Sequence, residues 1–134
     1  MKKRNGFTLI EIMLVVIILG VLAAMVVPRL VGRSEEARKS VAKTDIESGL
    51  ALALDLFETD SGAYPESLQA LLEPPANSKD WKGPYLKKKP VDPWGHDYVY
   101  RYPGTHNTDG YDLLSMGKDG VEGTADDVTN WQED

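Results

Sequence analysis

The chain begins with an uninterrupted apolar run. Residues 7–27 are 21 consecutive positions that contain one charged side chain, Glu11. A helix rises about 1.5 Å per residue, so this run reaches across the roughly 30 Å hydrocarbon core of a bilayer. Three basic side chains precede it at residues 2–4, and such a flank stays on the cytoplasmic side. The pattern predicts one membrane-spanning helix, with residues 28–134 forming a globular domain across the membrane.

A cleaved secretory signal is the first alternative for this run. Such a signal has an apolar stretch of about 7–15 residues that ends at a small-residue cleavage site. Ala23 and Ala24 resemble that site, but they lie deep inside the longer apolar run. An uncleaved anchor therefore fits the pattern better.

The hydrophobic pattern then takes a helical period. The apolar positions recur at three- and four-residue spacings, which is typical of a helix with one face on a core; they are Ile46, Leu50, Ala53, Leu54 and Phe57. The first helix is thus expected to continue to about Asp60 and to end at Ser61 and Gly62. Pro28 removes one helical hydrogen bond and predicts a bend at the membrane exit.

Shorter elements follow the helix. Residues 66–72 predict a helical turn with Leu68, Leu71 and Leu72 packed inward, and the proline- and aromatic-rich residues 81–95 predict a structured loop. Alternation at residues 98–102 and 111–115 predicts two antiparallel strands. The expected fold class is α+β, with a long N-terminal helix packed on a small antiparallel sheet.

The composition excludes several classes of function. The 134 residues suit a single domain. A formal charge of −6 argues against nucleic-acid binding, which needs surplus Lys and Arg. The absence of cysteine excludes a disulfide framework, a thiolate metal site and a Cys nucleophile. The sequence contains no nucleophile elbow or phosphate loop, so an enzyme is not expected.

The start of the apolar run carries a motif. A charge near the bilayer centre costs at least about 2.5–3.5 kcal/mol, and less near the edge, where Glu11 could simply snorkel to the headgroups. The segment GFTLIE at residues 6–11, behind a short basic leader, resembles the class III signal of type IV pilins and pseudopilins. The resemblance implies that a prepilin peptidase removes leader residues 1–6 by cutting between Gly6 and Phe7, and that the Phe7 amine is then methylated.

This chemistry gives Glu11 a role that snorkelling does not. Cleavage creates an ammonium group on Phe7 at the bilayer edge, and the Glu11 carboxylate of a neighbouring subunit is a natural partner for it. Pairing the two charges favours assembly, so Glu11 is expected to set the register between subunits. The resemblance also makes stretching of the helix between Gly20 and Pro28 plausible in the assembled fibre.

Later motifs indicate one branch of this family. WKGPYL, DPWG, YVYRYPG and DLLSMGKDG together resemble the major, G-type pseudopilin of type II secretion. The resemblance implies a type IV pilin-like fold and a homopolymer that grows as a periplasmic pseudopilus from a bacterial inner-membrane assembly platform and drives export of folded proteins. It also implies minor pseudopilins and the peptidase and methyltransferase as partners, and the lipid bilayer as the location before assembly. A type IV pilin, a minor pseudopilin and a signal-anchored periplasmic enzyme remain alternatives.

The acidity is concentrated at the C-terminus. Residues 103–134 hold eight acidic side chains against one base, Lys118, which by composition favours a frayed tail. However, Asp119 precedes Gly120, and Asp126 and Asp127 follow Gly123 and Thr124, so a glycine-hinged loop can bring hard oxygen ligands together, as calcium requires. The spacing is not that of an EF-hand.

The resemblance to the G-type family implies one structural calcium ion in this loop. It gives carboxylate ligands at Asp119, Asp126 and Asp127, and main-chain or hydroxyl oxygens at Leu114 and Ser115, with a carbonyl from Val121. Pilins commonly brace this region with a disulfide, which a chain without cysteine cannot form. His96 and His106 each lie beside a turn, so surface roles are expected for both rather than a zinc site.

Overall fold

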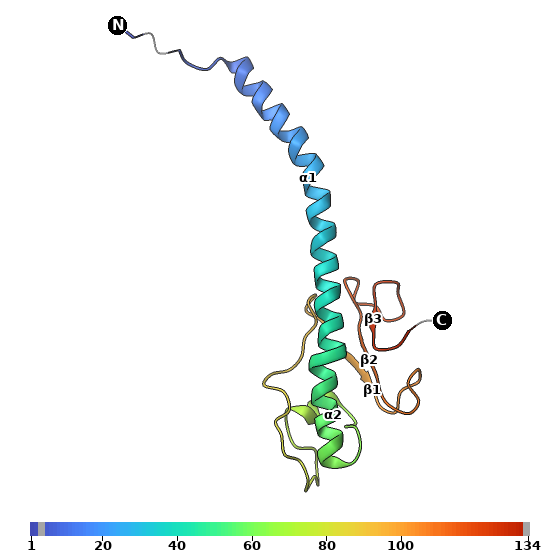
Figure 1. Cartoon of the computed structure of the whole chain (residues 1–134). Helices are drawn as coiled ribbons and strands as arrows, with labels where there is room; N and C mark the ends of the chain where they lie inside the picture. Colours follow the sequence, from blue (N-terminus) through green and yellow to red (C-terminus); the bar gives the residue numbers. More distant parts are fainter. Residues whose placement is uncertain (3–4, 133–134) are drawn as a thin grey trace. The chain divides into compact units, whose positions relative to one another are not determined.

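The computed structural model describes residues 1–2 and 5–132, but not the side chains of residues 27–31. The chain divides into two compact units, Met1–Ala37 and Arg38–Asp134. Figure 1 shows the elements in order, and their bounds are α1 (Leu9–Thr44), the π-helical turn η1 (Asp45–Gly49), α2 (Leu50–Ser61), the 3₁₀ turn η2 (Leu68–Leu71), β1 (Val99–Arg101), β2 (Asp112–Ser115) and β3 (Val128–Thr129).

The first unit contains the apolar part of α1. The window Leu9–Val26 is long and apolar enough to cross a membrane, and none of it is buried within the protein. This agrees with the predicted span. The backbone is helical from Leu9 to Thr44, whereas the predicted bend at Pro28 falls on residues 27–31, outside the described side chains.

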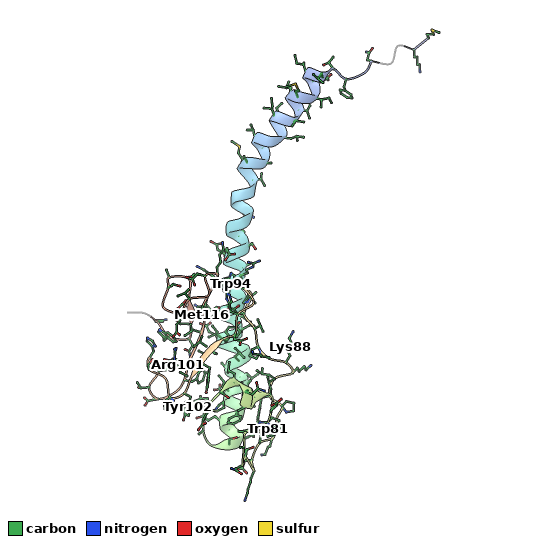
Figure 2. All side chains as sticks on the ribbon, turned by 180° about the vertical axis from the view of Figure 1, so that it is seen from behind. Trp81, Lys88, Trp94, Arg101, Tyr102 and Met116 are labelled. Atoms are coloured by element: carbon green, nitrogen blue, oxygen red, sulfur yellow. The ribbon has the colours of Figure 1, made fainter. Side chains whose placement is uncertain are left out.

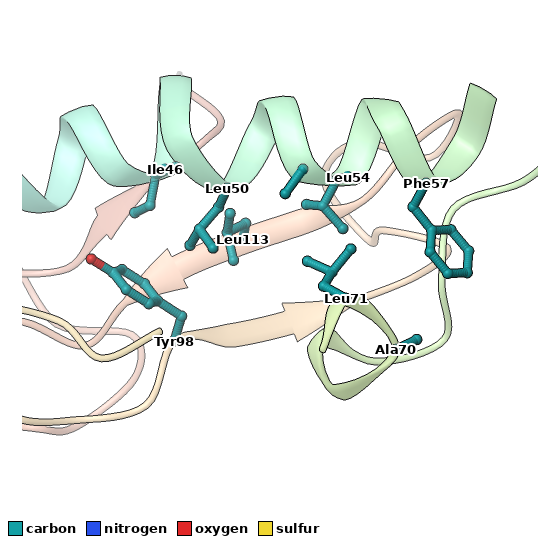
Figure 3. Packing of buried hydrophobic residues seen from close by; sticks show 9 residues of the cluster. Ile46, Leu50, Leu54, Phe57, Ala70, Leu71, Tyr98 and Leu113 are labelled. Carbon is teal, nitrogen blue, oxygen red and sulfur yellow. The ribbon is translucent and has the colours of Figure 1, made fainter. Parts of the chain in front are cut away.

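The core of the second unit lies between the helix and the sheet. Figure 3 shows Ile46, Leu50, Leu54 and Phe57 pointing from the helix toward Leu113, Tyr98 and η2. All five positions of the predicted helical stripe are buried, so that prediction is confirmed. Each fully buried aliphatic side chain contributes about 1.5–3 kcal/mol relative to an exposed one, and this stripe therefore fixes the helix on the sheet.

The end of the helix also agrees with the sequence. Gly62 adopts a left-handed φ of 85°, and its N–H donates to the Glu58 carbonyl oxygen at 2.7 Å. Glycine is the residue that enters this conformation without a Cβ clash. The π turn η1 was not predicted, because such turns are rare and occur singly inside α-helices, and the spacing of four between Ile46 and Leu50 is also that of an α-helix.

The sheet has three antiparallel strands in the order β1-β2-β3. Tyr100 pairs with Leu113 across β1 and β2, and Ser115 pairs with Val128 across β2 and β3. The two predicted strands are present. The third, β3, was missed because two residues that follow an acidic loop carry no alternating pattern.

The loop between η2 and β1 is held by aromatic side chains, as predicted. Trp81 Nε1 donates to the Ala70 carbonyl oxygen at 2.8 Å, and Tyr85 Oη donates to Asp60 at 2.8 Å. Leu71 is fully buried, and Leu68 packs against the core. A 3₁₀ turn aligns residues three apart, which places Leu68 and Leu71 on the same side. Leu72, which was also expected to pack inward, is half-buried, whereas Ala70 is buried.

Buried tyrosines make the second unit sensitive to alkali. Burial, together with a hydrogen bond to Asp45, holds the pKa of the Tyr98 phenol far above its ordinary value, and burial also raises the pKa of Tyr100. The unfolded chain releases these protons from about pH 10, but the folded chain does not. The contribution of these tyrosines to the free energy of unfolding is therefore fully present below pH 10. Above pH 10 it falls, by about 1.4 kcal/mol per pH unit for Tyr98.

Urea unfolding between pH 9 and pH 12 checks this, with phenolate absorbance recorded beside the unfolding signal. We expect the phenolate signal of Tyr98 to appear together with unfolding, and the variant Tyr98→Phe to show a shallower loss of stability above pH 10. Ionisation of Tyr98 in the native state at its ordinary pKa would contradict the prediction.

Candidate functional site

The N-terminal site lies at the start of α1. Gly6 and Phe7 are exposed and precede the first helical residue, Leu9. Thr8 caps the helix, because its Oγ1 accepts a hydrogen bond from the Glu11 N–H at 3.3 Å. Thr8 and Glu11 have the spacing of a capping box, which was not recognised in the sequence. The Gly6–Phe7 bond is therefore outside the helix, with Glu11 in its first turn.

The acidic loop of the second unit brings three of the predicted ligands together. One carboxylate oxygen from each of Asp119, Asp126 and Asp127 lies within 4.8 Å of the others. Calcium binds oxygen at about 2.3–2.6 Å, so ligands on opposite sides of one ion lie about 5 Å apart. The donor set, three hard carboxylates in an exposed or half-exposed loop, fits a calcium ion.

Hydrogen bonds within the loop hold these carboxylates in place. The Thr124 hydroxyl donates to Asp126 Oδ1 at 2.7 Å, and the Asp119 N–H donates to Asp126 Oδ2 at 3.0 Å. These bonds, with that of Thr124 foremost, lower the pKa of Asp126 to about 2. The Gly123 N–H donates to Asp127 Oδ2 at 2.7 Å. Asp126 is consequently ionised at neutral pH, as a cation ligand must be.

The structure places the other predicted ligands as follows. Leu114 and Ser115 are buried in β2, where the Ser115 hydroxyl donates to Asp92 Oδ2 at 2.6 Å. Val121 is exposed; its N–H donates to Asp119 Oδ1 at 2.9 Å, and its carbonyl oxygen lies 3.1 Å from Thr124 Oγ1. The structure thus groups the three carboxylates, while a ligand role for Leu114, Ser115 and Val121 stays a prediction.

A buried carboxylate that sequence reasoning did not single out lies beside this loop. Asp92 Oδ1 accepts from the N–H groups of Trp94 at 3.0 Å and His96 at 2.8 Å, and the Gly95 N–H closes a turn on the Asp92 carbonyl oxygen. Figure 2 labels Trp94, which belongs to this turn, and Met116, which immediately precedes Gly117 in the sequence. The DPWG motif therefore contributes an aspartate that organises a turn.

A second buried carboxylate braces the loop between β1 and β2. Asp112 accepts from the N–H groups of Thr105, His106 and Asn107 at 2.8–3.0 Å. Burial alone would raise the pKa of Asp112, but the donors from His106, Asn107 and Thr105 outweigh it and hold the pKa well below its usual range. A Cβ at Gly104 would lie 2.5 Å from Asp112 Oδ1, so only glycine fits there.

The C-terminal segment is fastened rather than frayed as far as residue 131. Asn130 Oδ1 accepts from the Leu113 N–H at 3.0 Å, and Asn130 Nδ2 donates to the Tyr111 carbonyl oxygen at 3.0 Å. Trp131 stacks on His106 with ring centroids 4.0 Å apart. Both histidines thus have specific contacts, since His96 Nδ1 lies 3.2 Å from the Gly117 carbonyl oxygen. These polar contacts brace the region without a disulfide.

Two family models together match nearly the whole chain. The model described as "Type II secretion system (T2SS), protein G" matches residues 29–131. The model described as "Prokaryotic N-terminal methylation motif" matches residues 1–27. The first covers the unit that carries the acidic loop, and the second covers the leader and the apolar run.

Curated proteins and a solved structure agree with these matches. The type II secretion system core protein G of Pseudomonas aeruginosa is 49% identical, over 97% of this chain and 96% of the relative. The protein of the same name from Escherichia coli K12 is 48% identical, over 96% of this chain and 92% of the relative. The crystal structure of the major pseudopilin from the type 2 secretion system of enterohaemorrhagic E. coli aligns with a TM-score of 0.65 at 31% identity, covering 76% of this chain and 89% of that one.

Proposed function

Since the chain belongs to the family of type II secretion system protein G, it is a structural pseudopilin and not an enzyme, and we propose how its parts perform that role. The single observation that carries the proposal is the match of the protein G model over residues 29–131, directly preceded by the methylation motif over residues 1–27. The chain polymerises through its N-terminal helix into a pseudopilus. Neither a type IV pilin, a minor pseudopilin nor an anchored enzyme accounts for the protein G match.

Processing comes first. The prepilin peptidase cuts between Gly6 and Phe7, and a methyl group is added to the new amine of Phe7. Support comes from the methylation motif and from the exposed position of this bond ahead of the helix. Before assembly the mature chain spans the bacterial inner membrane once, through residues 7–27, with its second unit in the periplasm.

Assembly follows from the charges at this end. The ammonium group of Phe7 pairs with Glu11 of a neighbouring copy, which removes two unpaired charges from the apolar layer. The inner-membrane assembly platform adds subunits, and minor pseudopilins join the same fibre. Growth of the fibre through the periplasm pushes folded proteins toward the outer membrane.

The acidic loop supplies a structural cation site in the second unit. Asp119, Asp126 and Asp127 hold one Ca²⁺ ion, and oxygens from Leu114, Ser115 and Val121 complete the shell. The convergence of the three carboxylates supports this proposal. When bound, the ion neutralises their mutual repulsion and fastens the loop beside β3, which keeps the subunit in the form that assembles.

The N-terminus of the mature protein tests the function directly. We expect protein purified from cells with prepilin peptidase to begin at Phe7 and to carry one added methyl group, by intact-mass and fragment spectrometry. Protein from cells without the peptidase should retain residues 1–6 and form no fibres. A mature N-terminus at any other residue would refute the pilin-like assembly.

A further inference from the structure

The turn of the DPWG motif and the acidic loop are joined at one residue, Gly117. We propose that His96 and Ser115 are positioning residues that clamp Gly117 and thereby set the calcium ligand Asp126 in place, with Asp92 as the buried anchor of the clamp. The inference rests on the proposed calcium site. It adds His96 and Asp92, for which no ligand role is predicted, and it gives the Ser115 hydroxyl a role other than the predicted one of ligand.

The anchor is a buried carboxylate that accepts hydrogen bonds on both oxygens. The Asp92 side chain is completely buried and accepts the N–H groups of Trp94 and His96 on one oxygen and the Ser115 hydroxyl at 2.6 Å on the other. A buried carboxylate is stable only when its oxygens are matched in this way. The positions of both His96 and Ser115 are consequently fixed relative to each other, although they are 19 positions apart in the sequence.

The clamp itself holds both backbone groups of Gly117. The Gly117 N–H donates to Ser115 Oγ at 3.2 Å, and the Gly117 carbonyl oxygen lies 3.2 Å from His96 Nδ1. A carbonyl oxygen can only accept, so His96 carries its proton on Nδ1. The Ser115 hydroxyl donates to Asp92 and accepts from Gly117, which makes it a link in the clamp.

Gly117, held by this clamp, contacts the proposed calcium ligand Asp126. Its φ is +65°, and a Cβ added at this position would collide with the Asp126 carbonyl oxygen. The Gly117 backbone therefore packs directly on Asp126, with no side chain between them. The imidazole also reaches the loop at a second point, because a Cβ at Gly120 would lie 3.0 Å from His96 Nε2. Asp119 lies between these two contacts in the sequence.

The consequence is preorganisation. A loop whose ligands are already held in place loses less conformational entropy when the ion binds, and this raises affinity without any new metal contact. Loss of the hydrogen bond from His96 should release one end of the loop. One such bond contributes about 0.5–1.5 kcal/mol, which corresponds to a change in Kd of about twofold to tenfold.

Variants at position 96 separate positioning from bulk. In asparagine the side-chain amide occupies nearly the place of Nδ1, in glutamine it lies one carbon farther out, and leucine has no donor. We expect His96→Leu and His96→Gln to bind Ca²⁺ about five- to tenfold more weakly than wild type, and His96→Asn to remain within about twofold. The measurement is calorimetric titration of the full chain in detergent with calcium chloride.

A matched control tests whether general destabilisation explains the result. Trp81→Phe removes a hydrogen bond of the same kind, from a ring N–H to a carbonyl oxygen, in the same unit but away from the loop. It should lower the melting temperature and leave the Kd for calcium unchanged. If Trp81→Phe weakened binding as much as His96→Leu did, the effect would be one of stability, and the positioning role would be wrong.

Two further outcomes are distinguishable. Wild-type affinity in His96→Leu, beside a measurable Kd for the wild-type chain, would overturn the clamp and leave the calcium proposal intact. A wild-type chain that binds no calcium would overturn the calcium site itself and the clamp with it. If His96→Leu fails to fold, the comparison of His96→Asn with His96→Gln decides the question, because the two carry the same amide and differ only in its reach.

Discussion

Replacing Glu11 with alanine should lower fibre assembly about 100-fold while cleavage after Gly6 continues. Without the carboxylate, each added subunit brings an unpaired ammonium group on Phe7 into the edge of the apolar layer. A charge at the bilayer centre costs at least about 2.5–3.5 kcal/mol and less near the edge. A cost of about 2.7 kcal/mol, at the low end of this range, corresponds to a factor of about 100, since each 1.4 kcal/mol is a factor of ten. The substitution also removes the Glu11 charge from the unassembled subunit in the membrane. The loss of fibre therefore arises when subunits assemble.

The measurement is the amount of fibre recovered by shearing, compared with total subunit in the same cells, with the N-terminus checked by mass spectrometry. Thr8→Val is a matched control, because it removes the hydroxyl that caps the helix beside Glu11 without changing charge. Loss of such a cap costs about 1 kcal/mol, so this variant should lose far less fibre than Glu11→Ala. Equal assembly of Glu11→Ala and wild type would show that the charges do not pair.

The sequence predicted the helix and its partner strands because their signals are periodic. The buried stripe from Ile46 to Phe57 follows from helical spacing, and Gly62 ends the helix where a left-handed residue is needed. The strand β3 escaped prediction, because its two residues are ordered by their pairing with Leu114 and Ser115. Local pattern cannot report a strand whose stability comes from long-range pairing.

The candidate site, like the fold, could be predicted only in part. A cluster of acids after glycines is visible in the sequence, and the structure brings Asp119, Asp126 and Asp127 together. The roles of Asp92 and Asp112 were invisible, since each is defined by backbone N–H groups that converge only after folding. In the sequence, an aspartate whose carboxylate is buried in a turn cannot be distinguished from an exposed one, because its hydrogen-bond donors are not known. The bracing that replaces a disulfide was therefore beyond sequence reasoning.

Removing calcium should lower the melting temperature of the full chain in detergent by about 10–20 °C. At a calcium concentration 100 times the Kd, binding stabilises the native state by about 2.7 kcal/mol, and each kcal/mol shifts the melting temperature of a domain of this size by about 4–8 °C. Excess chelator should give the low value, and added calcium should restore the high one. Magnesium should not, because it demands a smaller octahedral shell.

The variant Asp126→Asn tests whether the acidic loop is the source of the calcium response. If the loop binds calcium, the variant should melt near the temperature of the chelated wild type and respond little to either chelator or calcium. If the loop binds no cation, neither the wild type nor the variant should respond to chelator or calcium, and the variant should lose only the stability that comes from the hydrogen bonds accepted by Asp126. Asp109→Ser, which removes an exposed acid outside the cluster, should melt and respond to calcium as wild type does. The response to calcium identifies the site, because the hydrogen bonds of Asp126 contribute stability with or without the ion, whereas only a bound ion makes the melting temperature depend on calcium.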